Sequence, residues 1–400
     1  MNARQQLTVP LLMALALLSA SAPFAIDMYL PALPDIVRDL DTTQPMVQLT
    51  LSAFLAGLAI GQLIIGPLSD ALGRHRLMLV GTVIALAAAV FAALAPTVEM
   101  LILARLIQGL GSGAAIVLSR AVVPDLASGA AAARAFALLM TIQGVAPFLA
   151  PVLGGVLTEP LGWRGLFWVL AGLAALQVIV VLTVIRESRP PEMRSPATVR
   201  GILGNYGYVL ASPGYRGYLV TFAAAFSAMF CYISASPFLM QEQLGMSVRG
   251  YATMFAVNGV GIIGGSLING RLIGRVPTER LLLGALVIQL VATSLLLGVV
   301  AWAPGKWAIM VLLFVAIANI SIVMGNTTAL GTGLVRERAG SASALMGAAQ
   351  FGIAGLVSPL MGLGPDAGVT MAIGMVVCFA VALAAAIYAT RVTAGPTSAS

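Results

Sequence analysis

The sequence predicts an all-α polytopic membrane protein, with twelve transmembrane helices in two halves of six and both termini in the cytoplasm. Three observations predict this fold class. Of the 400 residues, 60% are hydrophobic and only 9% are charged, whereas a soluble domain carries about 25% charged residues. The apolar residues gather in runs long enough to cross a bilayer. Lys and Arg gather at alternate ends of those runs.

The expected helices follow from the spacing of the charges. A span needs about 20 apolar residues, and eleven charge-free runs reach that length: 5–26, 42–69, 77–98, 135–158, 165–185, 217–241, 250–270, 281–305, 307–335, 339–365 and 367–390. A twelfth span fits between Glu99 and Arg120, interrupted by Arg105. The first run has an alternative interpretation as a cleavable signal peptide, because small residues occupy 19–22. Apolar character continues through Leu33, which favours a retained span.

The cations predict the orientation. Loops rich in Lys and Arg stay in the cytoplasm. With the N-terminus inside, 16 of the 21 Lys and Arg residues fall on the cytoplasmic side, four fall outside and Arg105 lies within a span.

A polar stretch at roughly 186–216 divides the chain between the sixth and seventh expected spans. We therefore expect an N-terminal six-helix bundle at 1–186, a cytoplasmic linker loop at 187–215 and a C-terminal six-helix bundle at 216–400. This is the organisation of a duplicated transporter, whose substrate site lies near the membrane midplane between the halves.

Composition argues against several other functions. The net charge of +7 is scattered singly between apolar runs, so no nucleic-acid partner is expected. Two cysteines in apolar runs, Cys231 and Cys378, and a single histidine, His75, indicate no disulfide framework, metal centre or Ser-His triad. The glycines at 109–113 and 264–265 lie inside expected spans, where close helix packing explains them better than a nucleotide. We expect no enzyme and no cofactor, and transport driven by an ion gradient or by the gradient of the substrate.

A charged turn follows the second expected span. It reads GPLSDALGRHR from Gly66 to Arg76. Gly66 and Gly73 allow a tight connection between helices, and Asp70 can meet a helix end or a cation of the other half. Together with Arg74, such a contact can latch the cytoplasmic side shut. An ordinary solvated turn is the alternative.

These residues resemble a known family. The pattern G-x-L-x-D-x-x-G-R at 66–74 is similar to the signature loop of the major facilitator superfamily. Adding DMYLPALP at 27–34, RLIQGLG at 105–111, YISASPF at 232–238 and AGSASA at 339–344, the chain resembles the Bcr/CflA group of bicyclomycin and chloramphenicol resistance exporters from about residue 20 to 360. The resemblance implies a drug:proton antiporter of the bacterial inner membrane, working as a monomer in the lipid bilayer, with an essential arginine in span four.

Two features depart from the family pattern. The family usually has Arg after the loop aspartate, whereas this chain has Ala71, so part of the charge latch is missing or displaced. Its antiporter pattern in span five favours Gly before the prolines, whereas alanines precede Pro147 and Pro151 here, and Gly154 and Gly155 follow. Small residues still permit close packing and a bend in this helix.

Asp27 is the one acidic residue of 14 that falls inside an apolar segment. A carboxylate within the membrane is costly and by default marks a functional site. We expect Asp27 to bind and release the coupled proton. The alternative is a cap on the outer end of the first span, because Pro31 and Pro34 follow closely.

Arg105 is the one cation inside an expected span, at a depth similar to that of Asp27. An Asp27–Arg105 ion pair, broken by protonation or by substrate, would couple the two. A purely structural arginine bonded to backbone carbonyls is the alternative.

Uncharged polar residues within the spans complete the expected substrate cavity: Gln108, Gln143, Tyr232, Asn258, Asn326 and Gln350. In lipid such groups turn toward a cavity or another helix, so helix–helix contact is the alternative for each. With one membrane carboxylate, neutral or zwitterionic drugs similar to chloramphenicol or bicyclomycin fit better than polyvalent cations. We therefore expect proton-coupled drug efflux by alternating access. The alternatives are export of a physiological metabolite (an amino acid, peptide or sugar) and a non-transporting sensor or assembly factor.

Overall fold

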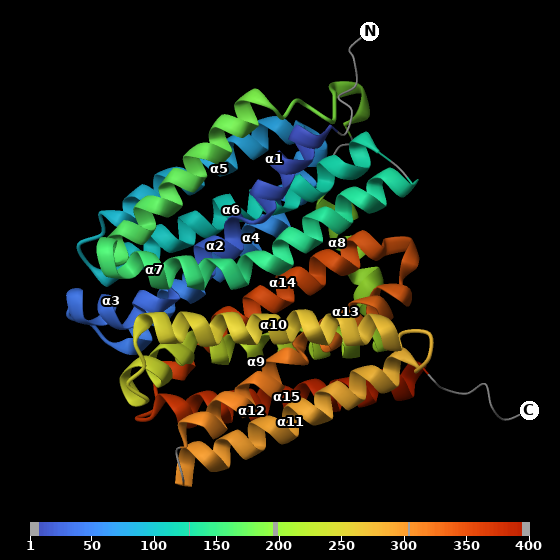
Figure 1. The fold of residues 1–400 in the computed structure, drawn as a ribbon. Helices are drawn as coiled ribbons and strands as arrows, with labels where there is room; N and C mark the ends of the chain where they lie inside the picture. Colours follow the sequence, from blue (N-terminus) through green and yellow to red (C-terminus); the bar gives the residue numbers. More distant parts are fainter. Residues whose placement is uncertain (1–7, 128, 195–198, 303–304, 394–400) are drawn as a thin grey trace, which may run out of the picture. The chain divides into compact units, whose positions relative to one another are not determined.

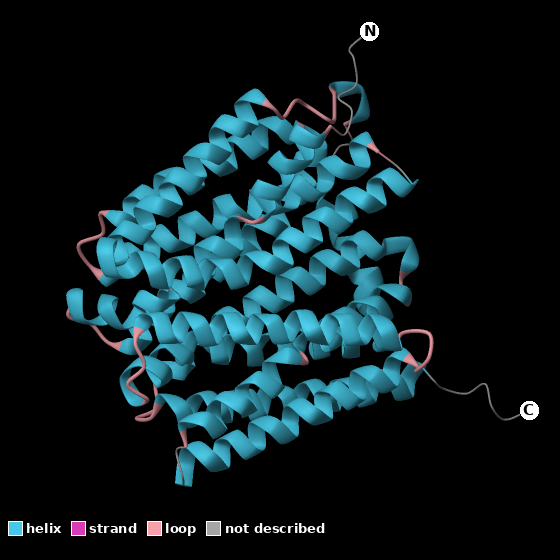
Figure 2. Cartoon of the chain, viewed as in Figure 1, coloured by secondary structure: helices cyan, strands magenta, loops and turns pink. Residues whose placement is uncertain are grey.

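The computed structural model describes residues 8–127, 129–194, 199–302 and 305–393, and within these ranges the chain is almost entirely helical (Figures 1 and 2). An isolated bridge between Ile273 and Val276 is the sole β-type pairing in the described parts. The chain forms two compact units, Met1–Val199 and Arg200–Ser400.

The first span is segmented. α1 (Val9–Ser19) is followed by α2 (Ser21–Asp27), a 3₁₀ turn η1 (Leu30–Ala32) and α3 (Leu33–Asp39). Prolines explain the segments: Pro31 and Pro34 occupy the first turns of η1 and α3, where a missing N–H costs no hydrogen bond. Asp27 therefore ends a helix within an apolar stretch, and its neighbourhood is irregular backbone.

Three long helices follow: α4 (Gln44–Leu72), α5 (Arg74–Ala93) and α6 (Val98–Leu126). The expected loop from Gly66 to Arg76 is wrong, because most of this segment is helical. α4 continues through Gly66 and Asp70 to Leu72, and α5 begins at Arg74. Gly73 alone joins them, with φ of 95°, a conformation that side chains disfavour. Leu and Ala at 68, 71 and 72 favour helix, so the turn shrinks to the one residue that leaves it.

α7 (Gly129–Thr183) contains the expected run 135–158 and all but the last two residues of the run 165–185. Its backbone leaves helical geometry at Gly162, with φ of 63°, and stays helical through Pro147 and Pro151. By length and composition, eleven helices in the described ranges could cross a membrane, with Leu149–Thr183 counted as one. A bend at the two prolines stays a prediction.

Glycines set the packing of α6. A Cβ atom on Gly109 would lie 2.1 Å from the Phe54 carbonyl oxygen of α4, and one on Gly111 would lie 2.4 Å from the Gly81 oxygen of α5. Real Cβ atoms do not approach so closely, so these helices touch backbone to backbone. This confirms the packing interpretation of the glycines at 109–113.

The second unit contains a further set of helices: α9 (Pro213–Pro237), η3 (Phe238–Gln243), α10 (Val248–Leu272), α11 (Thr278–Trp302), α12 (Lys306–Ala318), α13 (Ile320–Gly333), η4 (Arg336–Arg338), α14 (Ala339–Val357), η5 (Ser358–Gly362) and α15 (Ala367–Thr393). Gly265 of α10 packs against the backbone of α12, since its Cβ would lie 2.2 Å from the Ala318 oxygen. The expected linker loop contains η2 (Pro191–Met193) and a helix that the sequence did not predict, α8 (Val199–Ala211). The predicted boundaries at 186 and 216 stay predictions.

Candidate functional site

Arg105 lies at the centre of the first unit with none of its surface exposed. Its Nη1 donates a hydrogen bond to Oε1 of Gln108, one turn later on α6, at 2.7 Å. Its Nε and Nη2 have no hydrogen-bond partner. A buried guanidinium with two unused donors is costly unless something compensates its charge.

Aromatic rings supply part of that compensation. The guanidinium carbon lies 4.3 Å from the ring centroid of Phe54, 4.5 Å from that of Tyr29 and 5.7 Å from that of Phe167. Ring faces attract cations most strongly in desolvated sites, by about 2 kcal/mol. The hydroxyls of Tyr29 and Thr50 are 2.9 Å apart, which fixes the tyrosine ring against α4.

Asp27 is buried as well, with 4% of its surface exposed, and its Oδ1 has no hydrogen-bond partner. It lies two residues before Tyr29, so the carboxyl group and the arginine both border the same tyrosine segment. The expected ion pair is not formed: among the described residues no salt bridge joins Asp27 to Arg105, whose guanidinium bonds Gln108 instead. Both groups keep unsatisfied atoms inside one helix bundle.

α7 packs directly on the Asp27 segment. A Cβ atom on Gly154 would lie 1.9 Å from the Met28 carbonyl oxygen, so any larger residue would displace the backbone that carries Asp27. The Thr158 hydroxyl donates to the Gly154 oxygen at 2.6 Å, and Pro151 and Gly155 are buried beside it. The structure thus joins the proline- and glycine-containing part of α7 to the predicted proton site.

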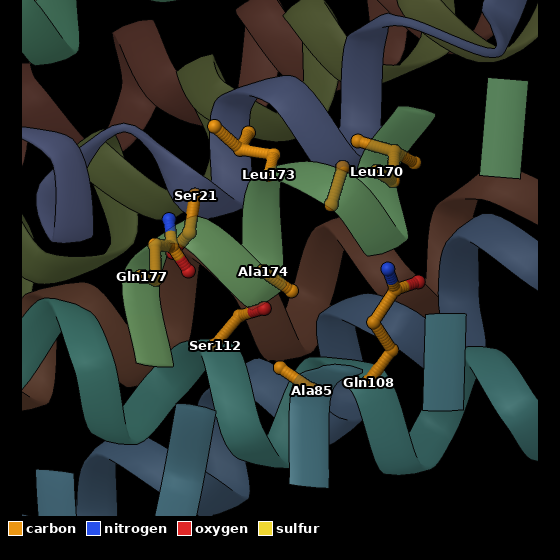
Figure 3. A pocket seen from close by; sticks show the side chains of 9 residues that line it. Ser21, Ala85, Gln108, Ser112, Leu170, Leu173, Ala174 and Gln177 are labelled. Atoms are coloured by element: carbon orange, nitrogen blue, oxygen red, sulfur yellow. The ribbon is translucent and has the colours of Figure 1, made fainter. Parts of the chain in front are cut away.

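A small cavity lies beside Gln108 within the first unit (Figure 3). Its volume is about 20 Å³, room for a single water molecule. Figure 3 shows the polar side chains of Ser21, Gln108, Ser112 and Gln177 around it, from α2, α6 and α7. This cavity is far too small for a drug.

A second polar cluster surrounds the α4–α5 turn. Arg74 is buried; its Nε donates to Oδ2 of Asp125 at 3.0 Å, and its Nη1 donates to the Ser69 hydroxyl. Its backbone N–H donates to Oε1 of Glu187 at 2.8 Å. The predicted gating arginine is therefore held by residues from three other parts of the chain. The side chain of Asp70 lies outside the described set.

The predicted cavity residues of the second unit form separate pairs. Asn258 donates to the Tyr232 hydroxyl at 2.8 Å, and the Tyr232 ring stacks on Phe255 with centroids 5.5 Å apart. Asn326 exchanges two amide hydrogen bonds with Asn269, at 3.0 and 3.2 Å.

These pairs differ in what they leave unsatisfied. The amides of Asn269 and Asn326 bond each other and so link α10 to α13. In contrast, the buried Oδ1 of Asn258 has no hydrogen-bond partner. Gln350 is half-buried on α14. The side chain of Gln143 lies outside the described set.

The groups that surround the predicted residues were not predicted from the sequence. Phe54, Phe167 and Gln177 lie in apolar or ordinary helical sequence, so nothing local distinguishes them. Asp125 and Glu187 stand at the ends of expected spans, where acidic residues are common. The adjacency of Tyr29 to Asp27 was the one local signal.

Comparisons with known proteins agree with this architecture. Residues 15–359 match the family model described as Major Facilitator Superfamily. The chain is 36% identical over 359 residues to the uncharacterized MFS-type transporter YdgK of Bacillus subtilis (strain 168), covering 89% of each chain. It is 30% identical to the multidrug resistance protein D of Escherichia coli (strain K12), covering 91% of each, and 27% identical to a bicyclomycin resistance protein homolog of Haemophilus influenzae, covering 90% of each.

Solved structures show the same fold. A bacterial homolog of the human lysosomal transporter Spinster superposes with a TM-score of 0.73 at 17% identity, covering 96% of each chain. The human organic anion transporter MFSD10 does so with a TM-score of 0.67 at 19% identity, covering 96% of this chain.

The chain belongs to the Major Facilitator Superfamily, a family of transporters, and its relatives confirm the resemblance to the bicyclomycin and multidrug resistance group. It is a multi-pass protein of the bacterial inner membrane. Small-molecule transport, and not catalysis, is the activity that this family supports.

Proposed function

We propose that the protein exports small neutral or zwitterionic drugs in exchange for protons, by alternating access. The observation that carries the proposal is the presence of two buried ionisable side chains with unsatisfied polar atoms in the first unit. Asp27 and Arg105 are both buried, border the same tyrosine segment, and leave a carboxylate oxygen and two guanidinium donors without partners. A group of this kind suits a site whose charge changes during the cycle.

Protonation explains the arrangement in the structure. A buried carboxyl group without partners is less costly when neutral, so this state fits a protonated Asp27. When the proton leaves, the carboxylate becomes a partner for the free Nε and Nη2 donors of Arg105. We propose that this switch of Arg105, between Gln108 with its aromatic cage and Asp27, couples proton release to movement of α2 and α7.

Drug recognition is assigned to uncharged groups. Tyr232, Phe255 and Asn258 offer two stacked rings and an unpartnered carbonyl oxygen, which suit a ligand with a planar group and a hydrogen-bond donor. Among the described residues of the second unit, none of the buried polar side chains is charged. This composition favours neutral over polycationic drugs.

The topology that we propose has twelve spans and both termini in the cytoplasm. α7 is 55 residues long, about 80 Å if it were one helix, which is far beyond the roughly 30 Å of a bilayer core. The break at Gly162 supports a division of α7 into two spans, which would raise the eleven candidates to twelve. A monomer in the bilayer is sufficient, because each unit holds its own polar cluster.

Inside-out membrane vesicles with an acidic interior test the proposal. Chloramphenicol, bicyclomycin and a lipophilic cation are added in turn, and internal pH is followed with a fluorescent dye. We expect chloramphenicol or bicyclomycin to make the interior more alkaline, with vesicles lacking the protein as the control. No response to any compound would contradict drug:proton exchange and favour export of a metabolite.

A further inference from the structure

The segment that follows α7 turns back onto the α4–α5 turn. α7 ends at Thr183, and four residues later the Glu187 carboxylate reaches the start of α5. Its Oε1 accepts the Arg74 backbone N–H at 2.8 Å, and its Oε2 accepts that of His75 at 3.3 Å. The first N–H groups of a helix have no partner within the helix, and a carboxylate also suits the positive end of its dipole. Glu187 therefore caps α5 from more than 100 residues away.

Gly73 is shaped to receive this carboxylate. It precedes α5 and provides no side-chain cap of its own. A Cβ atom at Gly73 would lie 2.5 Å from Oε2 of Glu187 and 2.8 Å from Nη2 of Arg194. With φ of 95° at the same residue, the backbone conformation of Gly73 disfavours a side chain, and a Cβ atom there would displace the Glu187 carboxylate.

The same segment fastens the end of α6. The Ser188 hydroxyl donates to Oδ2 of Asp125 at 2.9 Å, the oxygen that also accepts Nε of Arg74. Nη1 of Arg189 lies 3.9 Å from Oδ1 of Asp125. One short stretch of chain thus holds the ends of α5 and α6 together beside the end of α7.

Two cations of this segment, Arg189 and Arg194, lie close to the acidic residues around the α4–α5 turn. Position 71, directly after Asp70, is Ala. Arg189 approaches Asp125, and Nη2 of Arg194 lies 4.0 Å from Oε2 of Glu187. The charge network around Arg74 is therefore completed from the sequence that leads into the second unit.

We propose that residues Arg186–Arg194 form a linker clamp that sets the conformation of the α4–α5 turn, with Glu187 as its positioning residue. The clamp ends at Arg194, six positions before the second unit starts at Arg200. Displacement of the clamp during the transport cycle would disturb the cap of α5. The clamp acts on the rate at which the turn rearranges and leaves the drug site untouched. This inference rests on the proposed transport function.

The variant Glu187→Gln removes the charge and keeps the size of the side chain, and Glu187→Asp keeps the charge but shortens the reach. Glu192→Gln is the matched control, because Glu192 lies in the same segment and is exposed. Two readouts are measured on purified protein in lipid nanodiscs or vesicles. Hydrogen exchange of peptides covering residues 73–77 needs no substrate, and the drug-dependent proton flux gives kcat and KM.

We expect Glu187→Gln to speed exchange of the Arg74 and His75 amides about fivefold, the effect of losing a typical N-cap. The same variant should lower kcat with KM unchanged, with Glu187→Asp intermediate and Glu192→Gln like the wild type. Gly73→Ala should produce a similar change, and the double variant should be no worse than the stronger single one, because both disturb one contact.

Unchanged exchange in Glu187→Gln would overturn the cap, and faster exchange with unchanged kcat would overturn its positioning role. Failure of the wild type to move protons with any drug would contradict the proposed function. The exchange measurement would still decide the cap in that case.

Discussion

The two units bury different kinds of polar group. The first buries charged side chains, Asp27, Arg74 and Arg105, and leaves atoms of two of them unsatisfied. In the described part of the second unit, the buried polar side chains are amides and hydroxyls, such as Asn258, Asn326 and Ser234. Among the described residues, buried charged side chains thus lie in the first unit, and the buried polar side chains of the second unit can only form hydrogen bonds.

The difference assigns distinct tasks to the two units. A charged side chain in a membrane interior usually marks a functional site, because its desolvation costs free energy. Neutral amides and hydroxyls are less costly and discriminate between ligands by geometry. On this account, substitutions in the first unit alter coupling, and substitutions in the second alter apparent affinity.

Replacing Arg105 should have the largest effect. Arg105→Ala removes a charge-assisted hydrogen bond and the cation–π contacts, worth together about 3 kcal/mol, or roughly 100-fold in transport rate. Arg105→Lys should be intermediate, since an ammonium keeps the charge but not the planar fork that reaches Gln108 and stacks on rings. Drug-driven proton flux at equal protein level is the measurement. Arg38→Ala, which removes an exposed cation paired with Asp35, serves as control; equal activity of the three variants would contradict the role of Arg105.

Enlarging Gly154 should come next. Gly154→Ala places a methyl group against the Met28 carbonyl, and overpacking of this kind costs about 1–3 kcal/mol. Transport should fall roughly tenfold and the thermal midpoint in detergent should drop. The control is Gly172→Ala, in the part of α7 that follows the break at Gly162, where the new methyl group meets open space and should be neutral or slightly stabilising. Equal transport rates and equal thermal midpoints in the two variants would contradict a role in transport for the contact between Gly154 and the Asp27 segment.

A smaller effect is expected at Asn258. Asn258→Leu removes its hydrogen bond to Tyr232, and a net hydrogen bond is worth about 1 kcal/mol, so KM for drug should rise roughly fivefold while protons moved per drug stay constant. Gln289→Leu is the control, because Gln289 is another buried amide with an unpartnered oxygen, bonded to the Ala316 backbone. It should lower stability and leave KM unchanged. A change in the number of protons moved per drug in Asn258→Leu would contradict the assignment of proton coupling to the first unit and drug binding to the second.

The smallest effect concerns Asn269 and Asn326. Because their amides satisfy each other, we expect a coupling energy of about 0.6 kcal/mol, typical of such pairs in membranes. A double-mutant cycle with Asn269→Ala and Asn326→Ala in unfolding experiments measures it. Transport kinetics should not change. A raised KM for drug in Asn326→Ala would contradict this and indicate that Asn326 contacts the drug.

Sequence alone predicted the class of fold because charge spacing is a strong signal in membranes. The long apolar runs, the burial of Asp27 and Arg105 and the backbone packing of Gly109 all follow from composition and local pattern. The gap between the expected runs 135–158 and 165–185 agrees with the break of α7 at Gly162. The sequence did not predict that α4 continues to Leu72, since this depends on a single glycine among several.

The site was less predictable. The aromatic cage of Arg105 and the cap on α5 join residues far apart in the chain, and no local periodicity marks them. Phe54 and Phe167 look like any apolar residue of a span, and Glu187 looks like any linker acid. At Asn326 the sequence left both a ligand and a neighbouring helix as partners, and the amide bonds Asn269 of α10.

Proton coupling at Asp27 and drug binding in the second unit can be measured separately. Drug–drug exchange across vesicles needs the site and the conformational change but no net proton movement, whereas gradient-driven uptake needs both. The direct measurement compares the two in Asp27→Asn, whose side chain stays neutral and nearly isosteric. The account predicts that exchange persists and that uptake driven by the acidic interior is lost. Uptake at the wild-type rate in Asp27→Asn would contradict it.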